Sequence, residues 1–348
     1  MVHIGYIYQR RREKLLSIYL PQLANNKMTD FEPRKLIKFG NSSFIVSLPK
    51  EWVERNNLKK GDWIYLFGDN DDELKIKAKE KKDTPEEKRI DINITKQDIY
   101  DIKREINSAY VNNFNIFSIN GKNPKIKTEE IKRIFENLVG LEIVEENDNE
   151  LLVKDLLDME TISPKKIVKR MDITIRSMFE ELKFIKGKDL MLHQVKEIAE
   201  ADKSLNRLYF LASRVVKKGL MNPSILHMLA MSNDEISSMH WLVMNLEYIG
   251  DDLKRVSRHF LEIKSSEEQK KKVGEMLSEI EKIYIDSMSY YYNNDKQNAR
   301  ISLSKRQSFL KKCDELGKGY KEVAAGQMIE KLKSICSNIT NICRIIVY

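Results

Sequence analysis

Two carboxylates spaced four residues apart are the side chains of this sequence best placed to hold a cation. Glu247 and Asp251 lie in the segment Leu-Glu-Tyr-Ile-Gly-Asp, at positions i and i+4 of a predicted helix, so both leave it on one face. Carboxylates gathered in this way suit a divalent or ferric cation. The spacing alone is weak, because about eight such pairs are expected by chance in a chain with 53 acidic residues. Gly250 is more specific, since a glycine inside a helix costs about 1 kcal/mol and indicates a close approach of two helices.

A basic stretch near the N-terminus could contact the phosphates of nucleic acid. Residues 32–60 hold seven Lys and Arg side chains against three acidic ones, and this excess would double in a dimer. Contacts from Lys and Arg to phosphate give salt-dependent binding that is largely independent of sequence. The alternative interpretation is that this stretch only joins two copies of the chain. The side chains expected to face DNA are Arg34, Lys35, Lys38, Asn41 and Ser42.

The remaining reactive residues match no catalytic pattern. The five histidines form no His-Glu-x-x-His motif, and the chain has neither a Gly-rich phosphate loop nor a Gly-x-Ser-x-Gly elbow. Cys313, Cys336 and Cys343 make no Cys-x-x-Cys pair and are expected to be buried, reduced thiols of a cytoplasmic protein. We therefore expect no enzyme. The net charge of +8 is compatible with nucleic acid, and no apolar run is long enough to predict a membrane span.

Composition and turn signals divide the chain into four parts, which together predict a multidomain α+β protein. Residues 1–31 are interpreted as an N-terminal extension, and Met28 is an alternative start of translation because it lies just ahead of the first strand. Residues 32–80 form a β-rich unit, residues 89–160 a small α+β module, and residues 163–348 an all-helical region.

The β-rich unit is predicted to contain two hairpins separated by a Pro-started helical turn. The first strand begins at Arg34, and the apolar runs 44–46 and 63–67 are later strands. Gly40, Gly61 and Gly68 are expected to supply the positive φ of tight turns.

The module after it alternates strands and helices and has no catalytic signature. Thr128 is the expected N-cap of its second helix. The predicted strands are 89–94, 115–119, 141–144 and 151–153, and the predicted helices are 96–110 and 128–138.

From Ser163 onward the sequence is helical. Ser163 followed by Pro164 is a helix-start signal. Short connections between about six antiparallel helices predict a bundle, divided into two three-helix units. The predicted helices are 164–186, 189–218, 233–263, 267–293, 296–316 and 323–347.

The order of parts over residues 34–67 resembles the SpoVT/AbrB-like DNA-binding domain. The features that carry the resemblance are a basic strand, a Gly-Asn turn, a second strand, a Pro-started turn and a Gly-Asp turn into another hairpin. The resemblance implies a swapped-hairpin homodimer that presents Arg34, Lys35 and Lys38 to DNA.

The helical region resembles PhoU, a phosphate-signalling regulator built from two three-helix repeats. Segment 246–251 looks like the Leu-Glu-Arg-Ile-Gly-Asp segment of that family, and the likeness covers most of residues 163–348. In the family this segment binds metal together with an Asp-x-x-x-Asp stretch of the preceding helix. The ligands implied here are Asp202, Asn206, Glu247 and Asp251, with an amide in place of one carboxylate.

Two observations limit the implied metal site. The same groups could instead be solvated or paired with Arg207, Lys254 and Arg255. In the second repeat, Lys333 and Ser337 stand where Glu and Asp belong, so at most one metal site is implied.

An AbrB-like start joined to a PhoU-like bundle resembles a group of archaeal phosphate-uptake regulators. This implies a cytoplasmic regulator of phosphate homeostasis that binds DNA and senses or contacts partners through its bundle, with the phosphate ABC transporter or its signalling components as candidates. The alternative is an AbrB-type transcription regulator that answers to a signal other than phosphate. A carboxylate-metal enzyme would need a complete ligand set, which the sequence lacks.

Overall fold

The computed structural model divides the chain into two compact units, residues Met1–Lys82 and Asp83–Tyr348, which we describe separately as unit 1 and unit 2. The extension 1–31 and the predicted DNA-facing residues Asn41 and Ser42 lie outside the described residues. The structure describes residues 33–40, 43–70, 73–78, 87–95, 97–121, 125–147, 150–183, 192–264 and 266–348.

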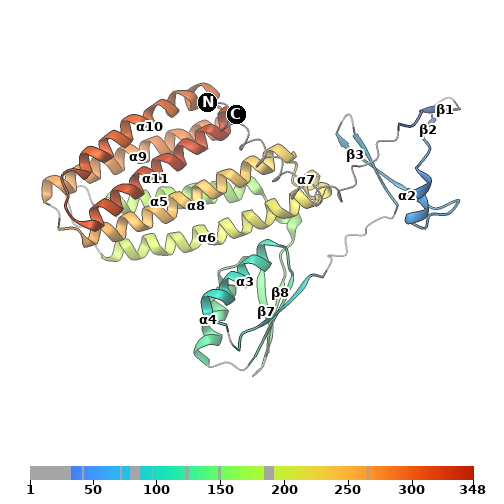
Figure 1. Ribbon diagram of the computed structural model, residues 1–348, viewed down its shortest axis with the longest axis horizontal. Coiled ribbons are helices and arrows are strands. Elements are labelled where there is room, and N and C mark those ends of the chain that lie inside the picture. Colours follow the sequence, from blue (N-terminus) through green and yellow to red (C-terminus); the bar gives the residue numbers. More distant parts are fainter. Residues whose placement is uncertain are drawn as a thin grey trace, which may run out of the picture. The chain divides into compact units, whose positions relative to one another are not determined.

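Unit 1 contains two antiparallel hairpins that form two separate sheets (Figure 1). Strand β1 (Ile37–Phe39) pairs with β2 (Ser43–Ile45), and β3 (Tyr65–Asn70) pairs with β4 (Glu73–Lys77). Helix α2 (Lys50–Arg55) lies between the hairpins and begins directly after Pro49, as the Pro-started turn predicted.

Two turn predictions for unit 1 hold and one is wrong. Gly40 has φ +67° and Gly61 has φ +96°, both in the left-handed region that glycine tolerates. Gly68 instead lies within β3, opposite Leu74 and beside a register shift. A strand accommodates glycine at such an irregularity. The first strand also begins later than expected, so Arg34 precedes β1.

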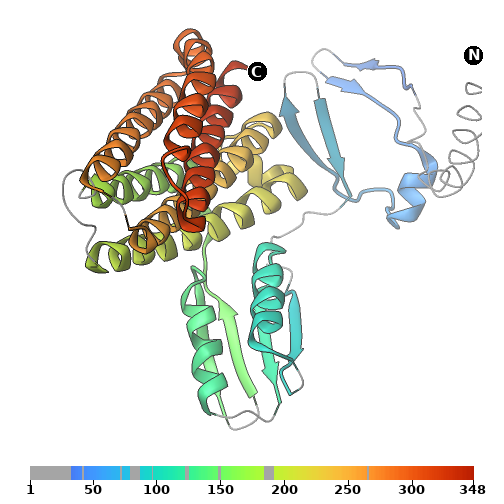
Figure 2. The ribbon, with the colours of Figure 1, turned by 60° about the vertical axis from the view of Figure 1, so that its left-hand side comes forward.

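Unit 2 begins with a four-stranded sheet in the order β5-β6-β8-β7. Strands β5 (Arg89–Asn93) and β6 (Ile116–Asn120) are parallel and are joined by helix α3 (Ile99–Val111), as a crossover requires. Strands β7 (Leu141–Glu146) and β8 (Glu150–Asp155) form an antiparallel hairpin, and β8 pairs with β6. Helices α3 and α4 (Lys125–Glu136) contact each other, and α3 packs beside β5 and α4 beside β7 (Figure 2). A core that includes Ile106, Phe117 and Phe135 fills this module.

The expected cap of the second helix is wrong. Helix α4 starts at Lys125, three residues before Thr128. Thr128 therefore lies inside the helix and cannot be its N-cap, because an N-cap is the residue that flanks the first helical turn.

In the rest of unit 2, the described residues form six long helices and shorter helical turns (Figure 2). Ser163 caps α5, its side chain accepting a hydrogen bond from the backbone of Lys166, with Pro164 in the first turn as the sequence predicted. Capping boxes at Ser232 and Ser266 start α8 and α9. The short helix α7 (Pro223–Met228) was not predicted. The long helices are α5 (Pro164–Leu182), α6 (Leu192–Met221), α8 (Asn233–Glu262), α9 (Glu267–Asn293), α10 (Lys296–Gly317) and α11 (Val323–Val347).

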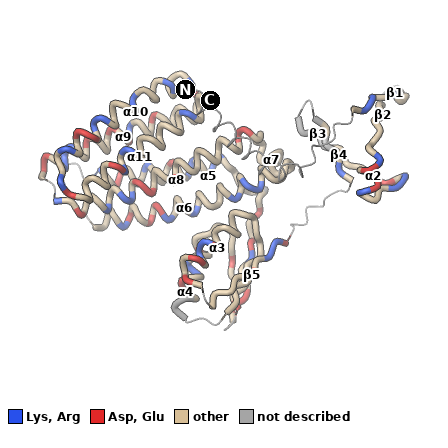
Figure 3. The backbone as a smooth tube through the Cα atoms, viewed as in Figure 1, with Lys and Arg blue, Asp and Glu red and all other residues tan. Residues whose placement is uncertain are grey.

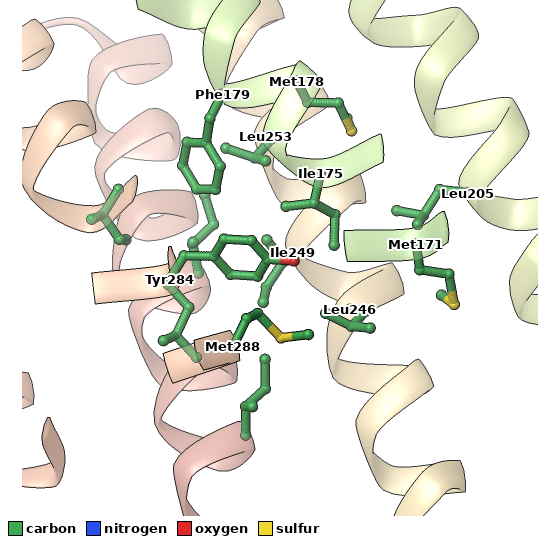
Figure 4. Packing of buried hydrophobic residues seen from close by; sticks show 14 of the residues in the cluster. Met171, Ile175, Met178, Phe179, Leu205, Leu246, Ile249, Leu253, Tyr284 and Met288 are labelled. Atoms are coloured by element: carbon green, nitrogen blue, oxygen red, sulfur yellow. The ribbon is translucent and has the colours of Figure 1, made fainter. Parts of the chain in front are cut away.

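The bundle helices pack in two groups of three around one large core, and a small separate cluster of Ala299, Cys343 and Ile346 lies between α10 and α11. Helices α5, α6 and α8 contact one another, as do α9, α10 and α11, and α8 also packs along α11. The core includes Met171, Phe179, Leu246 and Tyr284, which meet between α5, α8 and α9 (Figure 4). Among the described residues, no helix is both long and apolar enough to cross a membrane.

Candidate nucleic-acid interface and carboxylate cluster

The basic residues of unit 1 that were predicted to face DNA lie on or just before its first hairpin and are exposed. Arg34 and Lys35 precede β1, and Lys38 lies in its middle. In the register of the hairpin, Lys38 is opposite Phe44, whereas Ile37 is opposite Ile45. Because successive side chains of a strand point to opposite faces, Lys38 lies on the face away from the Ile37–Ile45 pair. One face of the hairpin therefore carries Ile37, Phe39 and Ile45, and on the other face Lys38 lies beside the exposed Phe44.

Unit 1 exposes apolar side chains in a way that a stable single copy would not. Among its described side chains, none is buried. Monomeric proteins rarely leave so many large apolar side chains of one small unit in water. The exposed large hydrophobic residues are Leu36, Ile37, Phe39, Phe44, Ile45, Val46, Trp63, Ile64, Leu66 and Leu74.

A tight turn holds further basic residues between the two hairpins. The backbone N–H of Lys59 donates to Oδ2 of Asp62 at 2.7 Å, across the turn that contains Gly61. Lys59 and Lys60 are both exposed there. The exposed Lys50–Glu54 pair at 3.6 Å contributes little, as is usual for ion pairs in water.

The four predicted metal ligands come together on α6 and α8, with a lysine among them. Nζ of Lys254 lies 2.7 Å from Oδ2 of Asp202 and 2.8 Å from Oδ1 of Asp251. Nδ2 of Asn206 donates to the same Asp202 oxygen at 3.2 Å. Nε of Arg255 lies 2.7 Å from the other oxygen of Asp251. The carboxylates are therefore paired with Lys254 and Arg255, which is the alternative that the sequence left open.

The fourth residue of the cluster, Glu247, has a perturbed carboxyl group. Burial is the main cause, and the nearby Asp251 and Asp202 add to it, which raises the pKa of Glu247 to about 7 although Lys254 opposes the shift. For Lys254 itself, burial acts to lower the pKa, but the bonds to Asp202 and Asp251 outweigh it and raise the pKa above its ordinary value.

This arrangement does not suit a metal ion as it stands. A cation bound by Asp202 and Asp251 would have to displace the ammonium group of Lys254, which already bridges them. Within the described residues, no group of three or more His, Cys, Asp or Glu side chains is disposed to hold a metal. The metal site stays a prediction.

Gly250 permits the close helix approach that the sequence indicated. A Cβ atom added at Gly250 would lie 2.1 Å from Cδ2 of Leu205 on α6. Helices α6 and α8 therefore touch here, one turn from the Asp202–Lys254 pair.

The corresponding place in the second three-helix group is built differently. Lys333 on α11 pairs with Asp314 at 2.8 Å and with Glu330 at 2.7 Å, and these bonds raise the pKa of Lys333. Ser337 accepts a hydrogen bond from Arg306 at 3.3 Å. At the positions equivalent to Glu247 and Asp251, this place carries Lys333 and Ser337.

Residues 37–84 match the family model described as "Antidote-toxin recognition MazE, bacterial antitoxin". This unit is MazE/AbrB-like. The match spans both hairpins of the MazE/AbrB-like unit and leaves the helices of unit 2 outside it. No curated protein and no solved structure matched the chain in the corresponding searches.

Sequence reasoning missed the buried joint between the α+β module and the bundle. Arg214 of α6 is 2% exposed and pairs with Asp155 at the end of β8. Its guanidinium lies 4.7 Å from the ring centre of Tyr110 on α3, and its Nε donates to Asn113 at 3.3 Å. In a helix with several Lys and Arg residues, the sequence alone does not distinguish a buried arginine from a solvated arginine.

Proposed function

We propose that this protein is a non-enzymatic regulator that binds DNA as a homodimer through its MazE/AbrB-like unit. The observation that carries the proposal is the combination of two surfaces on one hairpin. One face presents Ile37 and Ile45, which a second copy would cover, and the other presents Lys38 beside Phe44, where DNA phosphates would attract the lysine. The family match of residues 37–84 supports the same conclusion.

Dimer formation follows from the energetics of the exposed apolar side chains. Burying apolar surface contributes about 25 cal/mol per Å², and the two hairpins of one copy do not bury each other. A second copy that interleaves its hairpins with these would supply the missing core. The basic residues of both copies would then lie on one dimer, which doubles the charge available to DNA.

We further infer that the bundle links this DNA binding to phosphate uptake. Support comes from the sequence of segment 246–251, from the close approach of α6 and α8 at Gly250, and from the cluster of Asp202, Glu247 and Asp251 beside it. The proposed place of action is the cytoplasm, with components of phosphate transport as candidate partners of the bundle. No step of this proposal uses a metal. The alternative function is the same DNA-binding regulator answering to another signal.

The proposal is tested by measuring DNA binding to the promoter of the chain's own gene and to promoters of nearby phosphate-transporter genes. At one fixed salt concentration, we expect binding to these duplexes at least tenfold tighter than to shuffled duplexes of equal length. Equal, weak binding to all duplexes would contradict a sequence-selective regulator. Transporter expression that changes with phosphate in the wild type but not in a deletion strain would support the phosphate role, and unchanged expression would favour another signal.

A further inference from the structure

The first two turns of α5 carry four basic side chains on one exposed face. These are Lys165, Lys166, Lys169 and Arg170, which we call the α5 basic face. At 100° per residue they lie on the same side of the helix as the exposed Ile173. The opposite side is buried in the bundle core. No acidic residue occurs between 164 and 171.

Within the described residues, the α5 basic face forms no ion pair. None of its four residues has a carboxylate partner in the part of the chain that the structure describes, whereas many basic residues elsewhere in the bundle do. Arg176, two turns further along α5, pairs with Asp172 at 2.9 Å, and Lys331 pairs with Asp252 at 3.1 Å. Acidic and basic residues are interspersed along the bundle helices (Figure 3). Within the described residues, the α5 basic face is therefore positive charge without a carboxylate partner, a state that it shares with exposed cations of α10 such as Arg300 and Lys305.

Helix stability does not explain why cations gather there. The N-terminal end of a helix carries partial positive charge, so Lys and Arg are unfavourable in its first turns. At the start of α5 the Ser163 side chain accepts a hydrogen bond from the backbone N–H of Lys166, and Pro164 has no N–H to satisfy. The four cations therefore have no role in capping the helix. Charges that the helix itself disfavours are better explained by an anion outside the protein.

A nucleic-acid backbone fits this surface better than a membrane does. Lys165 to Arg170 extend over roughly 8 Å of helix, and a DNA duplex presents one negative charge per about 1.7 Å of its axis. A helix that binds a membrane surface needs a free apolar face to insert, but the apolar face of α5 is buried in the core. The chain also contains a MazE/AbrB-like unit with its own basic hairpin.

We propose that the α5 basic face is a second DNA-contacting surface, which binds the phosphate backbone without reading sequence. The inference rests on the proposed DNA-binding function and deepens it. The MazE/AbrB-like unit selects the site, and the α5 basic face adds salt-dependent affinity that is the same for every sequence.

The test is the salt dependence of DNA binding by the full-length chain in which Lys165, Lys166, Lys169 and Arg170 are all changed to Ala. Alanine is the strongest helix former, so α5 is kept, and circular dichroism checks this. The slope of log K against log salt is negative, and each lost phosphate contact lowers its magnitude by about 0.9. We expect a decrease of about 3 to 4 for each α5 basic face that binds, and equal weakening on promoter and shuffled duplexes.

A matched control distinguishes a direct contact between the α5 basic face and DNA from a general effect of the protein's net charge. Lys264, Lys271, Lys282 and Lys318 are also exposed and lie elsewhere on the bundle, and changing them to Ala removes the same charge. We expect the wild-type slope from this control. An unchanged slope in the α5 variant, or an equal decrease in the control, would overturn the inference.

Two further outcomes are distinguishable. Wild-type protein that binds no duplex at any salt concentration would overturn the proposed function and this inference together, whereas wild-type binding with an unaltered α5 variant overturns the inference alone. A variant that keeps its DNA slope but loses binding to phosphatidylserine vesicles would show that the surface serves a membrane instead.

Discussion

At the scale of single residues, the buried charges of unit 2 lie where elements meet. Asp172 on α5 accepts hydrogen bonds from Tyr284 at 2.9 Å and from Tyr292 at 3.1 Å, both on α9. The ion pair between Arg214 and Asp155 joins the bundle to the α+β module, and the ion pair between Lys254 and Asp202 joins α8 to α6. Removing one partner of such a pair leaves an uncompensated charge in a dry environment, which costs more than the pair itself contributes.

Arg214→Met should therefore destabilise unit 2 strongly. Asp155 would be left buried without its cation, and we expect the free energy of unfolding to fall by about 3 to 5 kcal/mol. Urea unfolding followed by circular dichroism measures this, with the exposed Arg258→Met as the control that stays within about 0.5 kcal/mol. A small effect of Arg214→Met would mean that water reaches Asp155.

Glu247 should make stability depend on pH. Its pKa of about 7 exceeds the ordinary value of 4.5, so the folded chain keeps a proton that the unfolded chain releases, and stability falls as the pH rises between those values. Glu247→Gln stays neutral and avoids this loss. We expect the stability of the variant relative to the wild type to increase by about 1 to 3 kcal/mol between pH 5 and pH 8. If the stabilities of the wild type and of Glu247→Gln changed with pH in the same way, the raised pKa of Glu247 would be contradicted. The exposed Glu136→Gln is the control, and its stability should follow that of the wild type.

At the scale of elements, the helices of the bundle were predictable and the contacts between them were not. The period of apolar residues and the start signal at Ser163 placed the six long helices within a few residues. The residues of the pairs Lys254–Asp202 and Tyr284–Asp172, which join these helices, are 52 and 112 residues apart, and no local pattern encodes such pairs. The same holds for Arg214–Asp155, 59 residues apart, which joins the bundle to the α+β module. Gly250 is the exception, because its cost inside a helix signals a close approach in advance.

Gly250→Ala should separate α6 from α8. The new Cβ would lie 2.1 Å from Leu205, and overpacking of this kind costs about 1 to 3 kcal/mol. Gly326→Ala in α11 is the matched control, because nothing lies within 4 Å of its added Cβ, and it should stabilise by about 0.4 to 1 kcal/mol. Adding Leu205→Ala to Gly250→Ala should recover part of the loss if the clash is the cause. Equal effects of the two glycine changes would show that the helices are not in contact at Gly250.

At the scale of the whole molecule, unit 1 is the part that needs a second copy of the chain. Sequence pattern predicted its hairpins and its basic residues, but the exposure of its apolar side chains became visible only in the structure. Alternation along a strand cannot tell whether an apolar face is covered by the same chain or by another one.

Charges placed on that apolar face should prevent dimer formation. Ile37 and Ile45 face each other across the first hairpin and are both exposed in one copy. We expect Ile37→Asp with Ile45→Asp to convert the protein to a monomer in sedimentation equilibrium, because two buried carboxylates without partners would oppose association. Tyr100→Asp on α3, where the side chain is 76% exposed, should leave the mass unchanged. A dimer that survives the double change would mean that unit 2 joins the copies.

The most direct test of DNA binding by unit 1 is the salt dependence of binding by Arg34→Ala with Lys38→Ala. Loss of both cations from each copy of a dimer removes up to four phosphate contacts. We predict weaker binding to the promoter duplex and a negative slope of log K against log salt whose magnitude falls by up to about 3.6. Affinity and slope equal to those of the wild type would show that this unit only joins two chains and that DNA is not its ligand.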